Sequence, residues 1–135
     1  MAKRINFGDI GNFASSQYEQ LLRSTVFETD KRLKEESPVD TGRFRLSWAI
    51  GENSQIDYDA GERTNPAAVS PPRRLNYQQE VLGGVYHISN SLPYAERLAY
   101  QAWSKQAPNP GWPDRIAAEM AKWARSEADR IGRSQ

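Results

Sequence analysis

The chain contains no cysteine and a single histidine among its 135 residues. Without cysteine it can form neither a disulfide bond nor a thiolate nucleophile or ligand. A zinc site around His87 would have to draw every other ligand from carboxylates or water, which is not a usual zinc environment. We therefore expect His87 to make a local hydrogen bond, and we predict no metal and no cofactor.

Long apolar runs are also absent. No stretch approaches the roughly 18 apolar residues that a membrane-spanning helix needs. Residues 1–7 become polar too soon to supply the apolar centre of a signal peptide. Together with the lack of cysteine, these features predict a soluble protein that is made in the cytoplasm and does not bind a membrane.

Neither sign of charge is in excess, because 18 Lys and Arg residues stand against 17 Asp and Glu residues, a formal net charge of +1. A dedicated nucleic-acid-binding domain normally carries a clear basic excess, since phosphate contacts supply much of its affinity. Locally, Arg73 and Arg74 follow two prolines and are candidates for contact with a partner or with DNA. Solvated surface charge is the alternative for this pair.

The length predicts one domain over residues 1–135, because two halves would each lack a sufficient core. Hydrophobic residues make up only 38% of the chain. The four Trp, six Tyr and four Phe residues offset that deficit, since each aromatic side chain buries a large area.

Three segments show the spacing of amphipathic helices. We predict a long N-terminal helix over about 11–36, a short helix over 93–101 with Pro93 in its first turn, and a C-terminal helix over 113–131. The inward-facing residues of the C-terminal helix would be Ile116, Met120, Trp123, Ala124, Ala128 and Ile131.

Two other segments have strand character. Residues 43–50 alternate between apolar and polar, and residues 81–89 are the second predicted strand. An irregular arm over 51–80 separates them, with a candidate short strand near 54–58. Such an arm either becomes ordered against a neighbouring molecule or remains a floppy surface loop. The buried face of the first strand would carry Phe44, Leu46, Trp48 and Ile50.

This order of elements predicts an α+β fold, in which long N- and C-terminal helices pack on a small antiparallel sheet and an extended arm joins the first strands. A sheet this small is expected to expose an edge or a face that a partner completes. Oligomerisation would satisfy that surface.

Asp40, Thr41 and Gly42 match the three-residue signature of aspartic proteases, which use two carboxylates that share a proton. The residues that follow argue against this chemistry, because Arg43 and Phe44 stand where a small residue is expected. Long terminal helices also do not belong to an all-β protease. We expect these residues to form a turn, in which Gly42 takes a backbone conformation that would be strained for other residues. We predict no catalytic residue and no enzymatic activity.

Three blocks, at 37–48, 88–98 and 103–112, are similar to the patterns P-V-D-T-G-x-L-x-x-S, I-x-N-x-x-P-Y-A-x-x-L/I-E-x-G and G-x-S-x-Q-A-P-x-G-M/W. In this order they resemble the neck and tail-completion proteins of tailed bacteriophages, including the minor tail protein Z type of lambda-like phages. The chain departs from the family where 100–102 replaces the glycine of E-x-G and where 109–110 adds a residue. The motif and turn residues are Asp40, Thr41, Gly42, Asn90, Pro93, Tyr94, Gln106 and Pro108.

The resemblance implies a structural virion protein at the head–tail junction, made in the host cytoplasm. Such a protein joins the portal–connector complex to the tail tube as a ring of copies, a hexamer or a ring related to the portal symmetry. The implied partners are further copies of the chain, the portal, adaptor or stopper, and the tail tube. Non-specific contact with DNA in the channel is also implied, and near-neutral charge would not retard passing DNA.

Two alternatives stay open. The first is a tail terminator that caps the tail tube in the adjacent layer. The second is a nucleic-acid-binding accessory protein that uses the basic arm together with exposed aromatic residues.

Overall fold

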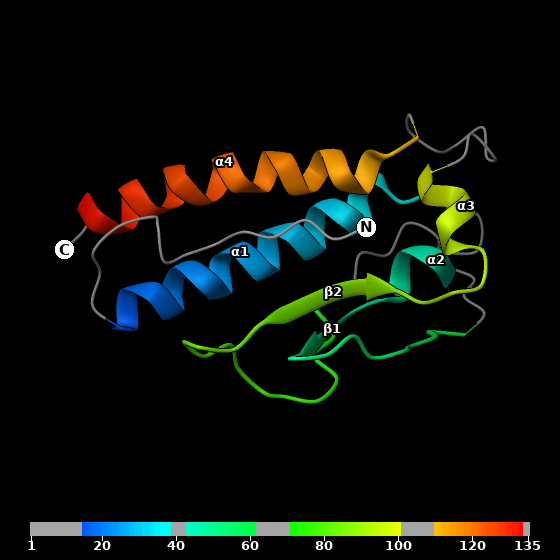
Figure 1. The fold of residues 1–135 in the computed structure, drawn as a ribbon, viewed down its shortest axis with the longest axis horizontal. Helices are drawn as coiled ribbons and strands as arrows, with labels where there is room; N and C mark the ends of the chain where they lie inside the picture. The colour runs from blue at the N-terminus through cyan, green and yellow to red at the C-terminus, as the bar shows by residue number, and fades with distance from the viewer. Residues whose placement is uncertain (1–14, 39–42, 62–70, 101–109, 134–135) are drawn as a thin grey trace.

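The computed structural model describes residues 15–38, 43–61, 71–100 and 110–133. Two long helices lie side by side on one side of a small sheet, with two short helices at one end (Figure 1). The predicted α+β fold, with a small antiparallel sheet and long terminal helices, is confirmed. No helix in the described ranges is long and apolar enough to cross a membrane. The elements are α1 (Ser15–Glu36), α2 (Arg43–Leu46), β1 (Trp48–Glu52), β2 (Tyr86–Asn90), α3 (Ala95–Tyr100) and α4 (Trp112–Arg133).

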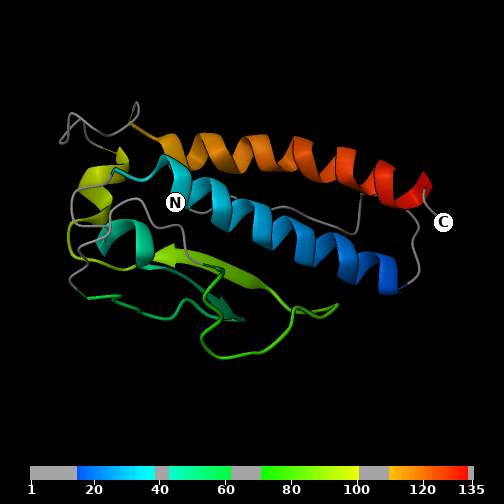
Figure 2. The same cartoon turned by 180° about the vertical axis from the view of Figure 1, so that it is seen from behind.

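The helices α1 and α4 run in opposite directions (Figure 2). Their apolar side chains pack against each other. Leu21, near the start of α1, packs with Ala128 and Ile131 near the end of α4. Leu33, near the end of α1, packs in one cluster with Met120 of α4. The predicted stripe of α4 is therefore the buried one, and α1 ends at Glu36 as predicted, while residues 11–14 lie outside the described ranges.

An aromatic cluster joins the sheet to the short helices and to α4. The rings of Phe44, Trp48 and Trp112 meet edge to face, with centroids 5.9 to 6.4 Å apart. Both indole N–H groups are satisfied although they are buried: Trp48 donates to the hydroxyl of Ser37 at 2.8 Å and Trp112 to the carbonyl of Leu98 at 3.0 Å. The cluster therefore gains apolar burial without leaving a buried donor unpaired.

The predicted strand over 43–50 is wrong in its first half. Arg43–Leu46 is a single helical turn, α2, and the strand begins only at Trp48. The side-chain amide of Asn90 donates to the backbone carbonyl of Phe44 at 2.8 Å, and the hydroxyl of Ser47 donates to the backbone carbonyl of Arg43 at 2.6 Å. These two carbonyls of the short helix therefore have hydrogen-bond partners. The alternation over 43–50 does not by itself exclude a helical turn at its start, because either conformation can bury Phe44.

The second predicted strand, over 81–89, begins later than expected, at Tyr86, and ends at Asn90. The preceding residues form a turn in which Gly84 donates to the carbonyl of Val81 at 3.1 Å and Gly83 has a φ of 95°. A positive φ of this size is costly for residues with a side chain, so the glycine favours the turn over a continued strand. The predicted short helix over 93–101 is present as α3, but it begins at Ala95, so Pro93 lies before the helix and not in its first turn; residue 101 lies outside the described ranges.

The strands β1 and β2 pair antiparallel, with Ile50 opposite Ile88. The arm returns along the other edge of β1, where the amide of Ile50 donates to the carbonyl of Arg73 at 2.9 Å and the amide of Leu75 donates to the carbonyl of Ile50 at 3.0 Å. β1 is thus the central strand of the sheet and β2 is an outer strand, which agrees with the deeper burial of β1.

The first part of the arm crosses the face of the sheet opposite the helices. No strand forms near 54–58; instead Tyr58 exchanges hydrogen bonds with the hydroxyl of Ser91, and the amide of Ala60 donates to the hydroxyl of Ser47. A Cβ atom at Gly51 would lie 2.2 Å from the carbonyl oxygen of Ser54, so this crossing requires glycine there. The described parts of the arm are therefore ordered against their own domain.

The helix pair supports a direct test of the core. Replacing Met120, which is fully buried between α4 and the aromatic cluster, with alanine is expected to destabilise the fold by about 2–5 kcal/mol, because a cavity remains. The matched change Lys122→Ala on the exposed side of α4 should alter stability by less than about 0.5 kcal/mol. Urea unfolding followed by circular dichroism measures both, and equal losses would contradict this arrangement.

Candidate interaction surface

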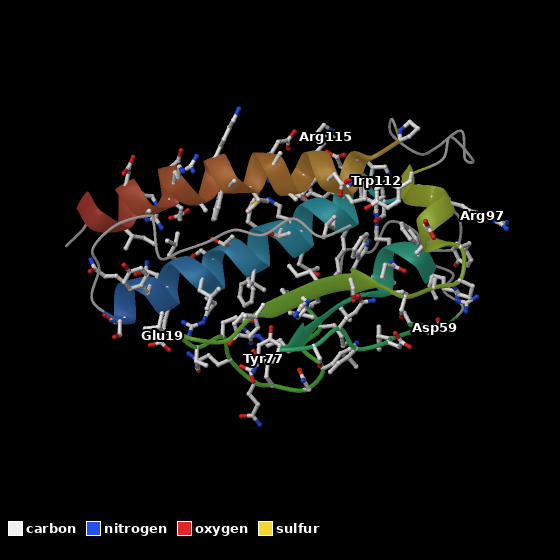
Figure 3. All side chains as sticks on the ribbon, viewed as in Figure 1. Glu19, Asp59, Tyr77, Arg97, Trp112 and Arg115 are labelled. Carbon is white, nitrogen blue, oxygen red and sulfur yellow. The ribbon has the colours of Figure 1, made fainter. Side chains whose placement is uncertain are left out.

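One buried carboxylate fixes the returning half of the arm. Glu80 has no exposed surface, and Arg74 donates to its two carboxylate oxygens at 3.0 and 2.7 Å. The hydroxyl of Tyr77, which is labelled in Figure 3, donates to the same carboxylate at 2.5 Å. Arg23 of α1 lies 3.9 Å from this carboxylate and donates to the backbone carbonyl of Glu80 at 3.5 Å. The arm is thereby tied both to itself and to α1.

The charges at this anchor are balanced. Burial opposes ionisation of Glu80, but the hydrogen bonds from Arg74 and Tyr77 outweigh it and hold the pKa of the carboxyl below its ordinary value. Hydrogen bonding to Glu80 raises the pKa of Arg74. Burial, together with the nearby carboxylate, raises the pKa of Tyr77. At neutral pH the anchor therefore consists of a carboxylate, a guanidinium and a neutral phenol.

A second buried ion pair holds the point where the described arm resumes. The ammonium group of Lys34 lies 2.8 Å from Asp30 and donates to the carbonyl of Pro71 at 3.2 Å. The pKa of Asp30 is raised, because burial outweighs the opposite effect of its hydrogen bond and charge interaction with Lys34. Buried ion pairs add little net stability over apolar residues of the same size. The structural effect of the pair between Lys34 and Asp30 is to place Pro71, and with it the arm, against α1.

Arg73 and Arg74 do not form one basic patch. The guanidinium of Arg74 lies 4.8 Å from the ring centre of Phe27 on α1, whereas that of Arg73 lies 5.2 Å from the ring centre of Tyr58 in the first part of the arm. Successive residues of an extended chain point to opposite faces, and the helices cover one face of this sheet while the first part of the arm crosses the other. Arg74 therefore contacts residues of its own domain, and Arg73 is the more exposed of the two.

The described surface carries one concentration of apolar side chains, which we call the arm patch: Phe27, Tyr77, Val81, Leu82 and Val85. In the described ranges five large hydrophobic residues are exposed, and four of them belong to this patch, with exposed fractions of 37% for Phe27, 44% for Val81, 53% for Leu82 and 50% for Val85. The turn that holds the last three projects beyond the end of the sheet (Figure 1).

A chain of side-chain contacts connects the part of the arm patch on α1 with the part on the turn before β2. Arg74 bridges Phe27 and Tyr77, at 4.8 and 5.9 Å from their ring centres. The ring of Tyr77 lies 5.0 Å from that of Tyr86, whose hydroxyl accepts from the amide of Val81 at 2.7 Å. Aromatic and aliphatic groups around a neutralised arginine are typical of protein–protein contacts. The patch is therefore suited to bind protein rather than phosphate.

The structure describes three of the eight motif residues. Asn90 accepts from the amide of Leu92 at 3.3 Å and donates to Phe44, while Pro93 is exposed at the start of the turn into α3. The ring of Tyr94 packs 6.4 Å from that of Phe44, centre to centre. In the described ranges no three His, Asp or Glu side chains gather closely enough to hold a metal ion. The motif residues outside these ranges are Asp40, Thr41, Gly42, Gln106 and Pro108.

Sequence reasoning missed the polar residues that position the arm. Asp30 and Lys34 are spaced four apart, and Asp30 lies between Val26 and Leu33 on the predicted apolar stripe, so their burial could have been read from helical geometry. Glu80 carries no comparable signal. Its burial depends on the path of a Pro-containing arm, which has no periodicity to read.

The Glu80 anchor generates a stability prediction. Glu80→Gln removes the anion and leaves the partly buried guanidinium of Arg74 without its counter-charge, so we expect a loss of about 2 kcal/mol or more. Gln79→Ala, a change at the exposed neighbouring position, is the control and should be nearly neutral. Chemical unfolding at pH 7 measures the difference, and equal stability of Glu80→Gln and the wild type would contradict the anchor.

The same residue should govern part of the acid sensitivity. Because the pKa of Glu80 is lower in the folded state, its stabilising contribution is complete above the ordinary carboxyl value of 4.5 and is lost as the pH falls through the folded value. The stability difference between wild type and Glu80→Gln should therefore shrink below about pH 4.5. Unfolding curves from pH 7 to pH 3 test this, and a constant difference would contradict it.

Comparison of the chain with protein-family models, curated proteins and solved structures finds no match.

Proposed function

We propose that this chain is a structural protein of a tailed-bacteriophage virion, located in the neck or tail-completion layer of the head–tail junction. In this role a ring of copies joins the portal–connector complex to the tail tube. The protein acts by binding rather than by catalysis. Its partners are other copies of itself, the portal, adaptor or stopper, and the tail tube.

The observation that carries the proposal is the packing of two motif blocks that lie far apart in the sequence. Asn90 of the second block holds the carbonyl of Phe44 of the first, and Tyr94 packs on the ring of Phe44 and on the guanidinium of Arg43, 6.0 Å from its ring centre. A shared structural unit explains why such residues would recur together in a family. This supports the family resemblance on which the proposed role rests.

The arm patch supplies a surface for assembly. Ring formation needs a patch that contacts a different surface of the next copy, repeated by rotation until the ring closes. An apolar turn that projects from the sheet end, held by the Glu80 anchor, meets the need for a rigid, desolvatable contact. We assign the arm patch to contact with a neighbouring protein of the junction.

The tail terminator remains the alternative within this role, because a ring that caps the tail tube would use the same kind of surface. The nucleic-acid alternative has less support. Arg74 is neutralised by Glu80 and points to the opposite face from Arg73, so the described parts of the arm offer no paired cationic site. Contact between Arg73 and DNA in the channel stays a prediction.

Loss of the gene tests the proposed role. When the phage that encodes this chain is grown without it, electron microscopy should show DNA-filled heads and complete tails that are not joined. Tails of abnormal length would favour the terminator alternative. Infectious particles at the normal titre would contradict both.

Single substitutions test the arm patch. Leu82→Lys places a charge on its most exposed residue and should reduce the yield of joined particles at least roughly tenfold, because a buried contact would have to desolvate the ammonium. Gln78→Lys adds the same charge at an exposed position outside the patch and is the control. Both variants should fold normally by circular dichroism, and full complementation by Leu82→Lys would contradict this use of the patch.

A further inference from the structure

The outer edge of β2 carries unpaired backbone groups. Both the backbone amide and the backbone carbonyl of Ile50 hydrogen-bond to the arm, so these two groups point away from β2. In an antiparallel pair the residue opposite then points outward too, so the amide and carbonyl of Ile88 face away from β1. The same alternation applies to Tyr86 and Asn90. In the part of the chain that the structure describes, nothing hydrogen-bonds to these outward backbone groups.

This edge lacks the features with which proteins protect exposed strands. The strand reads Tyr-His-Ile-Ser-Asn and contains no proline, lysine or other charged residue. The opposite edge of the sheet is covered, since the arm pairs with β1 at Ile50. Among the described residues, β2 is therefore the open side of the sheet.

The side chains of the outward-facing residues hold the edge in place. Tyr86 donates its hydroxyl to Glu52 at 2.9 Å, and Ile88 packs against the aromatic cluster. Asn90 is held by its bonds to Phe44 and Leu92. The edge is thus an ordered row of alternating donors and acceptors that needs little further ordering on binding.

We propose that the edge of β2 binds the same edge of a second copy of this chain, in antiparallel pairing centred on Ile88. The outward residues are spaced evenly about that centre, so Ile88 pairs with Ile88 of the second copy and Tyr86 pairs with Asn90. The pairing joins two small sheets into one continuous sheet.

The chemistry of the edge selects this occupant. A row with as many carbonyls as amides matches another peptide backbone and does not match phosphate, which offers acceptors alone. Self-pairing often fails because it places like charges opposite each other. No Asp, Glu, Lys or Arg stands between Tyr86 and Asn90, so this strand places no such pair opposite itself.

The inference goes beyond the proposed function. A two-fold contact closes a dimer, whereas a ring needs a contact that continues in one direction. The β2 dimer is therefore the form of the free protein, in which the open edge is protected before assembly. The dimer is tested with purified protein alone. The dimer can therefore be disproved while the proposed junction role stands, and the junction role can be disproved while the dimer stands.

Hydrogen exchange at single amides is the decisive measurement. The amide of Ile88 faces outward, while that of His87 faces β1. As concentration rises from micromolar to millimolar, light scattering should show conversion from monomer to dimer, and protection of Ile88 should rise on the order of tenfold or more while His87 stays protected throughout. A protein that remains monomeric, or a dimer in which exchange of Ile88 is unchanged, overturns the proposal.

A matched pair of substitutions provides a second test. Ile88→Pro removes the outward amide but no ladder bond to β1, and Ile88→Ala truncates the same side chain while keeping the amide. Ile88→Pro should weaken dimerisation roughly tenfold or more relative to Ile88→Ala. Equal dimerisation of the two folded variants overturns the proposal, and if Ile88→Pro does not fold, the exchange of Ile88 in the wild type decides.

Discussion

The burial of Glu80 governs how the rest of this domain is arranged. A carboxylate without exposed surface has to be matched by charge and hydrogen bonds, and here the partners come from Arg74 and Tyr77 on the arm and from Arg23 on α1. Meeting that requirement brings the arm against α1 and aligns it with the outer edge of β1. It also fixes the turn that leads into β2. The shape of the arm patch is thus a consequence of one electrostatic constraint.

The small size of the sheet imposes the second constraint. Two strands alone are marginally stable in water, so both faces and both edges of the sheet have to be considered. The helices cover one face, the first part of the arm crosses the other, and the returning arm pairs with one edge at Ile50. This leaves the edge of β2. The described parts of the arm, which resembled an unstructured connection in the sequence, therefore complete most of the sheet, and within the described ranges they leave one strand edge open.

The accuracy of prediction from the sequence followed the length of the periodic signal. The stripe of α4 spans several turns, and its spacing predicts both the helix and its buried face. At Phe44 and Leu46 the alternation over 43–50 indicated a strand, but a single helical turn can bury Phe44 equally well. Asp30 could have been placed in the core by its position on the α1 stripe, but Glu80 could not, because its burial follows from tertiary contacts of an aperiodic segment. The exposed arm patch was equally hidden, since Val81 and Val85 look like core residues of a strand until Gly83 is known to make a turn.

The pairing of charges makes a near-neutral chain compatible with the proposed assembly role. Arg74 and Lys34, two of the cations nearest the arm, form ion pairs with buried carboxylates. The surface beside them is therefore apolar rather than basic. A basic arm would bind any polyanion, whereas an apolar patch over a neutralised arginine binds only where a complementary surface excludes water. The two open surfaces also differ in kind. The arm patch offers side chains and is suited to an unlike neighbour, while the β2 edge offers backbone groups and fits another strand. A protein with both can protect one surface by self-pairing and still present the other to its partners.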